Sequence, residues 1–398
     1  MALEPGSVWL DARGTQSAAH GERGVGRYIA EQIEAILQRD SRLIAAVGLD
    51  PSLPVPGSLR KLESSGLLAA NEEGPRQGQA PSIYHVMSPF ETSYDLDGIW
   101  PPWARERCRL AVTLYDLIPL VFRQRYLEQW SAWTNQWLGR LGLIGSAETV
   151  LTISRNTADD AIRLLGLPEE RVTVVDCGVS GELAELVPSA EQAEEILRRE
   201  LRRVRPGFLL YVGGDDPRKN MEGTIRAYAR LPEEVRRAHQ LVIVCALGRL
   251  RRLHWMRLAR ELGIHRRELV LPGYIADREL AALYRCCGLF IFPSEYEGAG
   301  LPILEAMVCG APVAASNTSS IPELLGNDDA TFDPADPADI ARCIAAVVDD
   351  PARLEALRER SRRRVGLFTW ERVAERTIEG YRRALEGDSP ARVAVAAR

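Results

Sequence analysis

The stretch LFIFPSEYEGAGLPILEAMVCG, residues 289–310, joins a short apolar run, a glycine-rich turn and the start of a helix. The apolar run predicts a buried strand, and a loop from Pro293 to Leu301 follows it. Pro302 suits the first helical position, where a missing N–H costs nothing. Ligands of open α/β sheets bind at such junctions, beyond the carboxyl ends of the strands. The stretch therefore predicts a parallel sheet with a candidate site at its edge.

The same alternation of strand and helix runs through almost the whole chain. Six candidate strands, apolar and rich in β-branched residues, lie on each side of a polar helical stretch at residues 181–207. Such alternation is typical of parallel sheets with crossover helices. We therefore predict an α/β protein with two doubly wound, Rossmann-like, parallel-sheet domains, bridged by the polar stretch.

Composition narrows the functional classes. The 398 residues carry a formal net charge of -5 with nearly balanced basic and acidic residues, so no nucleic-acid partner is expected. The seven cysteines include no CxxC pair and no cluster with histidine at metal spacing, which fits a reducing cytosol without disulfides or structural zinc. No signal-peptide pattern and no apolar run of roughly 20 residues occur. We expect a cytoplasmic protein that is neither secreted nor integral to a membrane.

Two carboxylates of the opening stretch, Glu297 and Glu305, suit a ligand site. Gly298 and Gly300 let a ligand approach the backbone, and free N–H groups at the helix start favour an anion such as diphosphate. Glu297 in the turn and Glu305 in the first helical turn face the same crevice, and carboxylates accept hydrogen bonds from sugar hydroxyls. These features favour a sugar nucleotide, and the alternative is a capping glutamate beside an ordinary turn.

A second candidate site is FLLYVGGDDPRKNMEG, residues 208–223. The predicted strand is followed by Gly213 and Gly214, and then by Arg218 and Lys219 where a helix begins. Two cations beside a glycine turn suit a leaving diphosphate, because guanidinium can chelate two oxygens and ammonium adds a point charge. The alternative is a solvated helix start.

Two further motifs are weaker. Gly24 and Gly26 follow the first strand at a distance and lack the third glycine of a dinucleotide fingerprint, so we interpret them as a mobile glycine loop facing an interdomain cleft. YDLD, Tyr94–Asp97, contains the Asp-x-Asp pattern of some metal-dependent sugar transferases. We expect no metal, because Arg218 and Lys219 already supply the positive charge.

Aromatic and basic segments leave alternatives open. Helical spacing would put five residues on one helix face that is either core or an acceptor or membrane surface: Tyr126, Trp130, Trp133, Trp137 and Leu141. The arginine-rich segments at residues 197–205 and 248–260 are either solvated helix faces or phospholipid contacts.

The run EGAGLPILEAM, with Glu297 and Glu305 separated by seven residues, resembles the E-x7-E motif of retaining glycosyltransferases of family four. LLYVGGDDPRKNMEGTIRAY, LPGYIADRELAALYRCC, ASNTSSIPELLG and RGVGRYIAEQI also resemble segments of that family, in the expected order. The resemblance covers nearly the whole chain and is closest to the bacterial mannosyl- and rhamnosyltransferase-like branch that builds polysaccharides.

The resemblance implies a GT-B fold, in which two Rossmann-like domains face a cleft. The implied parts are an acceptor-binding domain at 1–185, a linker at 186–206, a donor-binding domain at 207–370, a helix at 371–386 that could pack back on the first domain, and a flexible tail at 387–398. The implied reaction is retaining transfer from a nucleotide-diphosphate sugar, without cofactor or metal, to a glycan, lipid-linked or small-molecule acceptor. Peripheral contact with the inner membrane face is left open.

The resemblance also assigns residues. Arg218 and Lys219 would hold the diphosphate, Glu305 the ribose and Glu297 the sugar, with Asp116 as a further catalytic position. The remaining donor-binding positions would be Gly24, Gly26, Gly213, Gly214, Tyr274 at the base, Gly298, Ala299, Gly300 and Leu301.

The sequence departs from the family pattern at two positions. Tyr115, predicted on the acceptor side, stands where a histidine usually precedes Asp116, and a tyrosine cannot relay a proton near neutral pH. Ala299 replaces a common phenylalanine. His85 either acts near the acceptor or packs in the core.

Two alternatives to a transferase remain. One is a non-catalytic subunit that binds sugar nucleotides or a partner enzyme. The other is a glycan phosphorylase, which would need a lysine for pyridoxal phosphate, and Lys219 is the only lysine in the C-terminal half.

Overall fold

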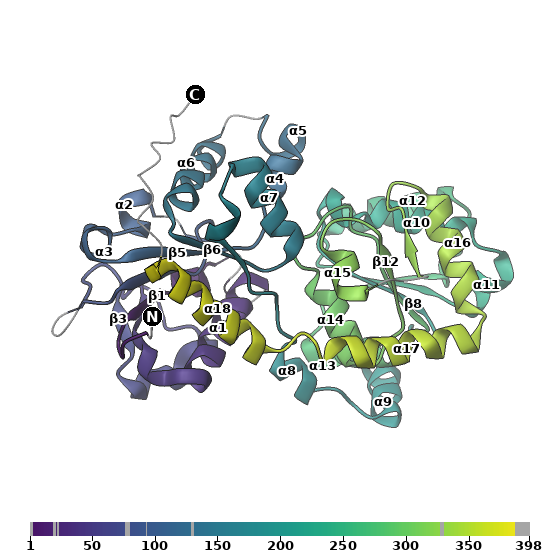
Figure 1. Cartoon of the computed structure of the whole chain (residues 1–398). Helices are drawn as coiled ribbons and strands as arrows, with labels where there is room; N and C mark the ends of the chain where they lie inside the picture. Colours follow the sequence, from purple (N-terminus) through teal and green to yellow (C-terminus); the bar gives the residue numbers. More distant parts are fainter. Residues whose placement is uncertain are drawn as a thin grey trace. The chain divides into compact units, whose positions relative to one another are not determined.

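A computed structural model of the chain describes residues 3–18, 21, 24–75, 80–92, 94–128, 131–326 and 330–386. The chain divides into two compact units. The first runs up to Gly178 and takes in the chain again from Thr369, and the second contains Val179–Phe368. Each unit is built on one parallel sheet packed with helices, so the expected two-domain α/β class is confirmed (Figure 1).

The strands of the first sheet follow the order β3-β2-β1-β4-β5-β6-β7. They are β1 (Val8–Asp11), β2 (Ile44–Leu49), β3 (Leu68–Ala70), β4 (Ile83–Val86), β5 (Arg109–Leu114), β6 (Thr149–Thr152) and β7 (Val172–Val174). Both faces of this sheet are covered, because Val8 and Leu10 enter one core while Trp9 enters the other. Only β3 was not predicted, since its three partly buried residues carry no distinctive pattern.

The helices of the first unit include the last one of the described chain. They are α1 (Gly24–Asp40), α2 (Leu96–Ile99), α3 (Pro102–Arg107), α4 (Ile118–Val121), α5 (Arg123–Tyr126), α6 (Ala132–Ser146), α7 (Arg155–Leu165) and α18 (Trp370–Glu386). Helix α18 packs along α1, where the buried Gln32 amide donates to the Thr377 hydroxyl at 3.0 Å. Helix α18 thereby completes the N-terminal unit.

The expected single aromatic face is wrong. Helix α5 ends at Tyr126, and a new helix, α6, starts after Ser131, whose hydroxyl accepts from the Thr134 N–H at 3.1 Å. Trp137 is buried and stacks on Phe90 with 4.9 Å between ring centroids, whereas Trp133 is half exposed. Trp130 lies outside the described residues.

The second sheet has the strand order β10-β9-β8-β11-β12-β13. Its strands are β8 (Leu209–Val212), β9 (Leu241–Val244), β10 (Leu269–Gly273), β11 (Leu289–Phe292), β12 (Val313–Ser316) and β13 (Thr331–Phe332). Its helices are α8 (Gly181–Glu185), α9 (Ala190–Glu200), α10 (Met221–Arg230), α11 (Glu233–Ala238), α12 (Arg249–Glu261), α13 (Asp277–Cys286), α14 (Leu301–Val308), α15 (Ile321–Leu325), α16 (Pro337–Val348) and α17 (Pro351–Val365).

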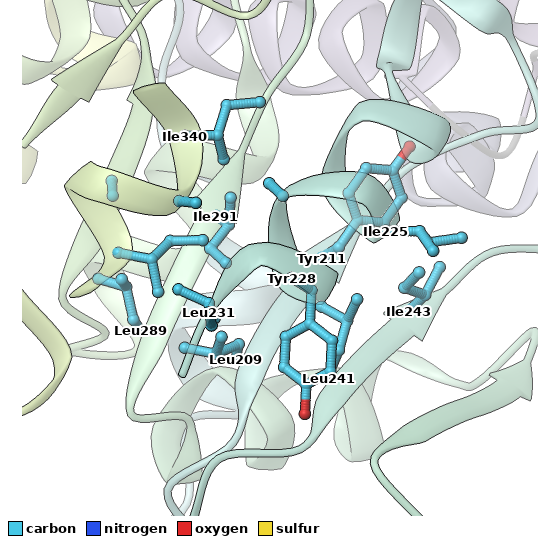
Figure 2. Close-up of a cluster of buried hydrophobic side chains, with 14 of the residues drawn as sticks. Leu209, Tyr211, Ile225, Tyr228, Leu231, Leu241, Ile243, Leu289, Ile291 and Ile340 are labelled. Carbon is cyan, nitrogen blue, oxygen red and sulfur yellow. The ribbon is translucent and has the colours of Figure 1, made fainter. Parts of the chain in front are cut away.

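One large core lies between this sheet and helices α10, α12 and α16. Leu209 and Tyr211 of β8 pack there with Tyr228 of α10 and Ile340 of α16 (Figure 2). The polar stretch 181–207 belongs to this unit and is not a separate bridge, because α9 packs along α13. None of the described helices is long and apolar enough to cross a bilayer.

His85 of β4 is fully buried. Its Nδ1 lies 2.7 Å from the Tyr381 hydroxyl of α18, and its Nε2 lies 2.8 Å from the Thr113 hydroxyl of β5. Burial lowers the pKa of His85 from 6.5 to about 3. The side chain does not reach the surface, so this structure gives His85 the packed role and not the acceptor role.

His85 should make the stability of the protein fall with acid. Below about pH 6.5 the unfolded chain binds a proton at His85 that the folded protein cannot accept until about pH 3. The free energy of unfolding should therefore fall by up to about 1.4 kcal/mol per pH unit over that window. Urea unfolding at pH 7, 6 and 5 measures this slope, and His85→Gln should reduce it. If the free energy of unfolding depends equally on pH in both proteins, the lowered pKa of His85 is contradicted.

Candidate active site

The two glycine-containing loops predicted as candidate sites end neighbouring strands. β8 and β11 pair in parallel at the point where the strand order reverses, with β9 and β10 on one side and β12 and β13 on the other. This is the topological switch point, beyond which open α/β sheets bind ligands. The loop after β8 carries Arg218 and Lys219, and the loop after β11 carries Glu297. The strand order therefore brings the two loops together.

A short 3₁₀ turn, Pro217–Lys219, fixes the two cations. The Asp216 carboxylate accepts from the Arg218 N–H at 2.9 Å, and Pro217 sets the backbone for the turn. Asn220 follows in a left-handed conformation (φ 57°) and its side chain caps α10 by accepting from the Gly223 N–H at 3.1 Å. The cations therefore project from a turn that is anchored at both ends.

Glu297 binds both cations. Its Oε1 lies 2.5 Å from Lys219 Nζ, and its Oε2 lies 3.0 Å from Arg218 Nη1. Arg218 also donates to the Tyr296 carbonyl. Burial of Glu297, which is 6% exposed, would raise the pKa of its carboxyl, but Lys219 and Arg218 hold this pKa below its usual range. The carboxylate is therefore ionised and its two partners are held against it.

The loop around Glu297 is braced by the segment after β12. The Ser319 hydroxyl accepts from the Glu297 N–H at 2.9 Å. The Ser320 hydroxyl lies 3.0 Å from the carbonyls of both Glu297 and Ala299. These serines were not predicted as site residues, although hydroxyl residues clustered directly after a strand are a usable signal. Ser319 thus binds an N–H group of the loop, and Ser320 binds two of its carbonyls.

Helix α14 begins beside this loop. It starts at Leu301, one residue earlier than expected, after Gly300 in a left-handed conformation (φ 97°). Gly298, Ala299 and Gly300 are buried, so the chain turns sharply into the helix. Glu305 is partly buried in the first turns, and its Oε2 accepts from the Tyr284 hydroxyl at 3.2 Å. The helix N-terminus and both glutamates therefore belong to one edge of the second unit.

The glycines after β8 have different surroundings. A Cβ on Gly213 would lie 2.7 Å from the Tyr211 hydroxyl, whereas one on Gly214 would meet nothing within 4 Å. Gly214 lines a pocket of about 390 Å³ together with Glu295 and the Asp215–Arg251 ion pair. Tyr274, predicted at the base, follows β10 and is largely exposed.

The glycines of the first unit lie in a helix. Gly24 and Gly26 form the first turn of α1, so the expected mobile loop is wrong at these two positions. A Cβ on Gly26 would lie 2.0 Å from the Gly21 carbonyl oxygen, which explains the need for glycine there. Their contact with a donor stays a prediction.

Tyr115 and Asp116 follow β5. The Tyr115 hydroxyl donates to the Met87 carbonyl at 3.1 Å, and burial raises the pKa of this tyrosine well above its usual value. Asp116 accepts from the N–H of Ile118, the first residue of α4, at 3.0 Å. Tyr115 is therefore no base near neutral pH, and the catalytic role of Asp116 stays a prediction.

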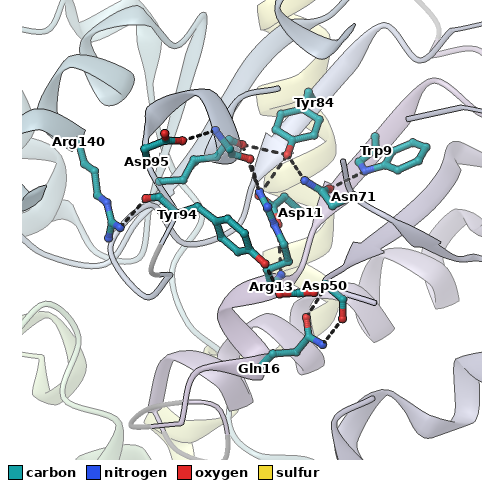
Figure 3. Close-up of polar contacts among 12 residues, drawn as sticks. Trp9, Asp11, Arg13, Gln16, Asp50, Asn71, Tyr84, Tyr94, Asp95 and Arg140 are labelled. Carbon is teal, nitrogen blue, oxygen red and sulfur yellow. Dashed lines mark hydrogen bonds and ion pairs between the residues drawn. The ribbon is translucent and has the colours of Figure 1, made fainter. Parts of the chain in front are cut away.

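An unpredicted buried network begins at the carboxyl end of β1. The Arg13 guanidinium donates to both oxygens of the Asp11 carboxylate, at 2.9 and 2.7 Å (Figure 3). It also donates to the Gly98 carbonyl at 2.9 Å. Tyr84 contacts Asp11 at 3.1 Å, and the Arg13 guanidinium lies over the Tyr94 ring. The Asp-x-Arg directly after the first strand was the available signal. The network ties β1 to α2 and to Tyr94 just before it.

The two aspartates of the Asp-x-Asp pattern have separate structural roles. Asp95 caps α2 by accepting from the Gly98 N–H at 2.8 Å, and Asp97 pairs with Arg105 at 2.7 Å. In the part of the chain that the structure describes, no cluster of three or more His, Cys, Asp or Glu residues could hold a metal ion.

Two family models match consecutive parts of the chain. The model described as Glycosyltransferase Family 4 matches residues 23–183, and the model described as Glycosyl transferases group 1 matches residues 192–364. The two parallel-sheet units have the GT-B fold of glycosyltransferases. The chain belongs to glycosyltransferase family four and is related to bacterial mannosyltransferases.

Two curated relatives come from Escherichia coli. Serotype-specific mannosyltransferase WbdA is 33% identical over 307 residues, which are 77% of this chain and 37% of that protein. O-antigen chain mannosyltransferase B is 33% identical over 239 residues, which are 60% of this chain and 61% of that protein. The matched region thus spans less than two thirds of either relative.

A solved structure shows the same fold. Anabaena HepE in complex with UDP-glucose superposes with a TM-score of 0.66 at 18% identity, covering 94% of this chain and 98% of that one. At this identity the likeness concerns the fold alone.

Removing the charge of Glu297 should strengthen anion binding. In Glu297→Gln the two cations lose their compensating carboxylate, so inorganic pyrophosphate should bind about tenfold more tightly at low salt. Isothermal titration calorimetry measures the change. Glu233→Gln, which removes one exposed negative charge from α11, is the matched control and should leave the affinity unchanged. Unchanged or weaker pyrophosphate binding by a folded Glu297→Gln protein would show that the cluster does not receive phosphate.

Proposed function

We propose that the protein transfers a sugar from a nucleotide-diphosphate sugar to an acceptor hydroxyl, with retention of anomeric configuration and without a metal ion. The observation that carries this proposal is the pairing of Glu297 with Arg218 and Lys219 at the switch point, beside the N-terminus of α14. Glu297 holds both cations at one position of the sheet edge, and Asp216 lies 3.8 Å from Arg218. The N-terminus of α14 lies beside these cations, and together they suit a diphosphate.

Each charged residue at this sheet edge would contact a different part of the proposed donor. Arg218 and Lys219 would bind the diphosphate and stabilise the charge that develops as it leaves. Glu297 would then accept hydrogen bonds from the sugar, while Glu305 would accept from the ribose. Because Arg218 and Lys219 already carry the charge that a divalent ion would supply, we propose metal-independent transfer. The nucleoside would extend along the exposed side toward Tyr274.

The proposed retention of configuration depends on which group accepts the proton of the acceptor hydroxyl. Tyr115 stands where the family pattern has histidine, and its raised pKa prevents it from taking a proton near neutral pH. The departing diphosphate would instead accept the proton of the acceptor hydroxyl, which attacks from the same face. This route breaks the bond to the diphosphate oxygen, forms the bond to the acceptor oxygen and retains the configuration.

The proposed setting is cell-surface glycan synthesis, with a hexose or deoxyhexose as the transferred sugar. Both Escherichia coli relatives are mannosyltransferases, and the name of one places it in O-antigen chain synthesis. Mannose is therefore the first sugar to test. We place the reaction in the cytoplasm, with peripheral contact at the inner membrane face when the acceptor is lipid-linked.

The second candidate function is a non-catalytic subunit. Only the hydrogen bond from the Tyr115 hydroxyl to the Met87 carbonyl favours it.

Nucleoside diphosphates should stabilise the protein without metal. We expect one of UDP, GDP, dTDP and ADP, at about a hundred times its dissociation constant, to add about 2.7 kcal/mol to the free energy of unfolding. Thermal unfolding with and without a chelator measures the effect. Stabilisation that disappears with the chelator would contradict metal independence, and no stabilisation by any of the four would remove the donor site altogether.

Two substitutions should separate binding from turnover. Lys219→Ala should lower kcat about a hundredfold with a smaller loss in donor affinity, because its charge matters most as the diphosphate leaves. Glu305→Gln should weaken nucleotide binding about tenfold, because one charged acceptor is lost. Steady-state transfer assays and calorimetry measure both, with exposed Glu261→Gln as the control. Nucleotide binding without transfer or donor hydrolysis in the unsubstituted protein would favour the non-catalytic subunit.

A further inference from the structure

Helix α12 exposes aliphatic side chains in the middle of a basic face. Leu250 is 81% exposed and Leu253 is 57% exposed, although both belong to a well-formed helix of the second unit. Arg249, Arg257 and Arg260 have spacings that put them on the same helix face as these leucines. Two exposed leucines held between arginines are unusual for a helix face that meets only water.

The charge around these leucines is strongly positive. In the described part of the chain, Arg249 and Arg260 form no ion pair, while Glu261 is paired with Arg257 at 2.7 Å. Arg266 follows shortly after the helix and is also exposed. The face therefore has cations in excess and little internal compensation.

A pocket opens next to this face. It has a volume of about 460 Å³ and is lined by apolar atoms of Met256, Ala259, Ile264 and Leu269. Its remaining walls carry basic side chains, namely those of Arg257, Arg260, His265 and Arg266. An apolar floor below a cationic rim suits a molecule that has a hydrocarbon chain and an anionic head.

We propose that the α12 surface, made of Arg249, Leu250, Leu253, Arg257 and Arg260 with the adjoining pocket, docks the second unit on an anionic phospholipid bilayer. The leucines would enter the headgroup region, and the arginines would bind lipid phosphates. The pocket would receive part of one acyl chain. Nucleic acid would satisfy the arginines but offers no apolar partner for the leucines, and an acidic protein would leave the rimmed pocket unexplained.

Vesicle flotation tests this surface directly. Purified full-length protein should float with vesicles of phosphatidylcholine containing phosphatidylglycerol, and not with phosphatidylcholine alone. In Arg249→Gln/Arg260→Gln the partition coefficient should fall about 25-fold, because each basic side chain near such a membrane contributes about a factor of five. Leu250→Ser/Leu253→Ser should lower it about tenfold or more and leave the remaining binding more sensitive to salt.

Matched variants separate this surface from general charge and hydrophobicity. Arg198→Gln/Arg199→Gln removes the same charge from α9, and Leu186→Ser removes another exposed leucine of the second unit. Both should bind vesicles like the unsubstituted protein. The proposal is overturned if the unsubstituted protein does not bind anionic vesicles, or if the α9 pair weakens binding as much as the α12 pair. Flotation needs neither donor nor acceptor, so its result is independent of the proposed transferase activity.

Discussion

The site depends on one electrostatic constraint, the burial of the Glu297 carboxylate. A carboxylate removed from water is costly unless charges or hydrogen bonds compensate it, and here Lys219 and Arg218 do so at 2.5 and 3.0 Å. The two cations come from the loop after β8, and the carboxylate comes from the loop after β11. The pairing therefore connects the two loops and gathers two cations at the sheet edge. An anion that arrives there meets side chains already held in place, so less ordering is required on binding.

The rest of the second unit supports this pairing. Neighbouring β8 and β11 bring the loops into contact range, and the Pro217–Lys219 turn directs both cations toward one carboxylate. Ser319 and Ser320 bind the backbone around Glu297, so the loop does not depend on a ligand for its shape. Gly300 then turns the chain into α14, and its carbonyl accepts from the Ile303 N–H at 2.9 Å. Each of these features lies beyond the carboxyl end of a strand, because a parallel sheet gathers its loops at that edge.

The sequence was informative wherever the pattern is local. Apolar runs identify every strand of the described chain except β3, and each of the two site loops was predicted from its own residues. The pairing of Glu297 with Lys219, 78 residues away, was not predicted. Local periodicity does not show which strands are neighbours in the sheet. In addition, Arg218 and Lys219 were expected to contact only the ligand. Gly26 was assigned to a loop for a related reason. Glycine occurs both in loops and where two backbone segments lie close together, and only the nearby Gly21 carbonyl shows that the second case applies here.

The arginines of the second unit differ in the kind of anion that they can bind. Arg218 is buried, fixed by Asp216 and partly compensated by Glu297, so it can accept only an anion that fits that geometry. Arg249 and Arg260 on α12 are exposed and form no ion pair among the described residues, so their attraction depends on charge density and not on shape. The first arrangement suits a small diphosphate, because exact placement of a few donors is what discriminates such a ligand. The second suits an extended anionic surface, because many weak and screened contacts add up there. The exposed leucines beside Arg249 and Arg260 supply the apolar contact that charge alone cannot give, which is why a lipid surface fits α12 better than a soluble anion.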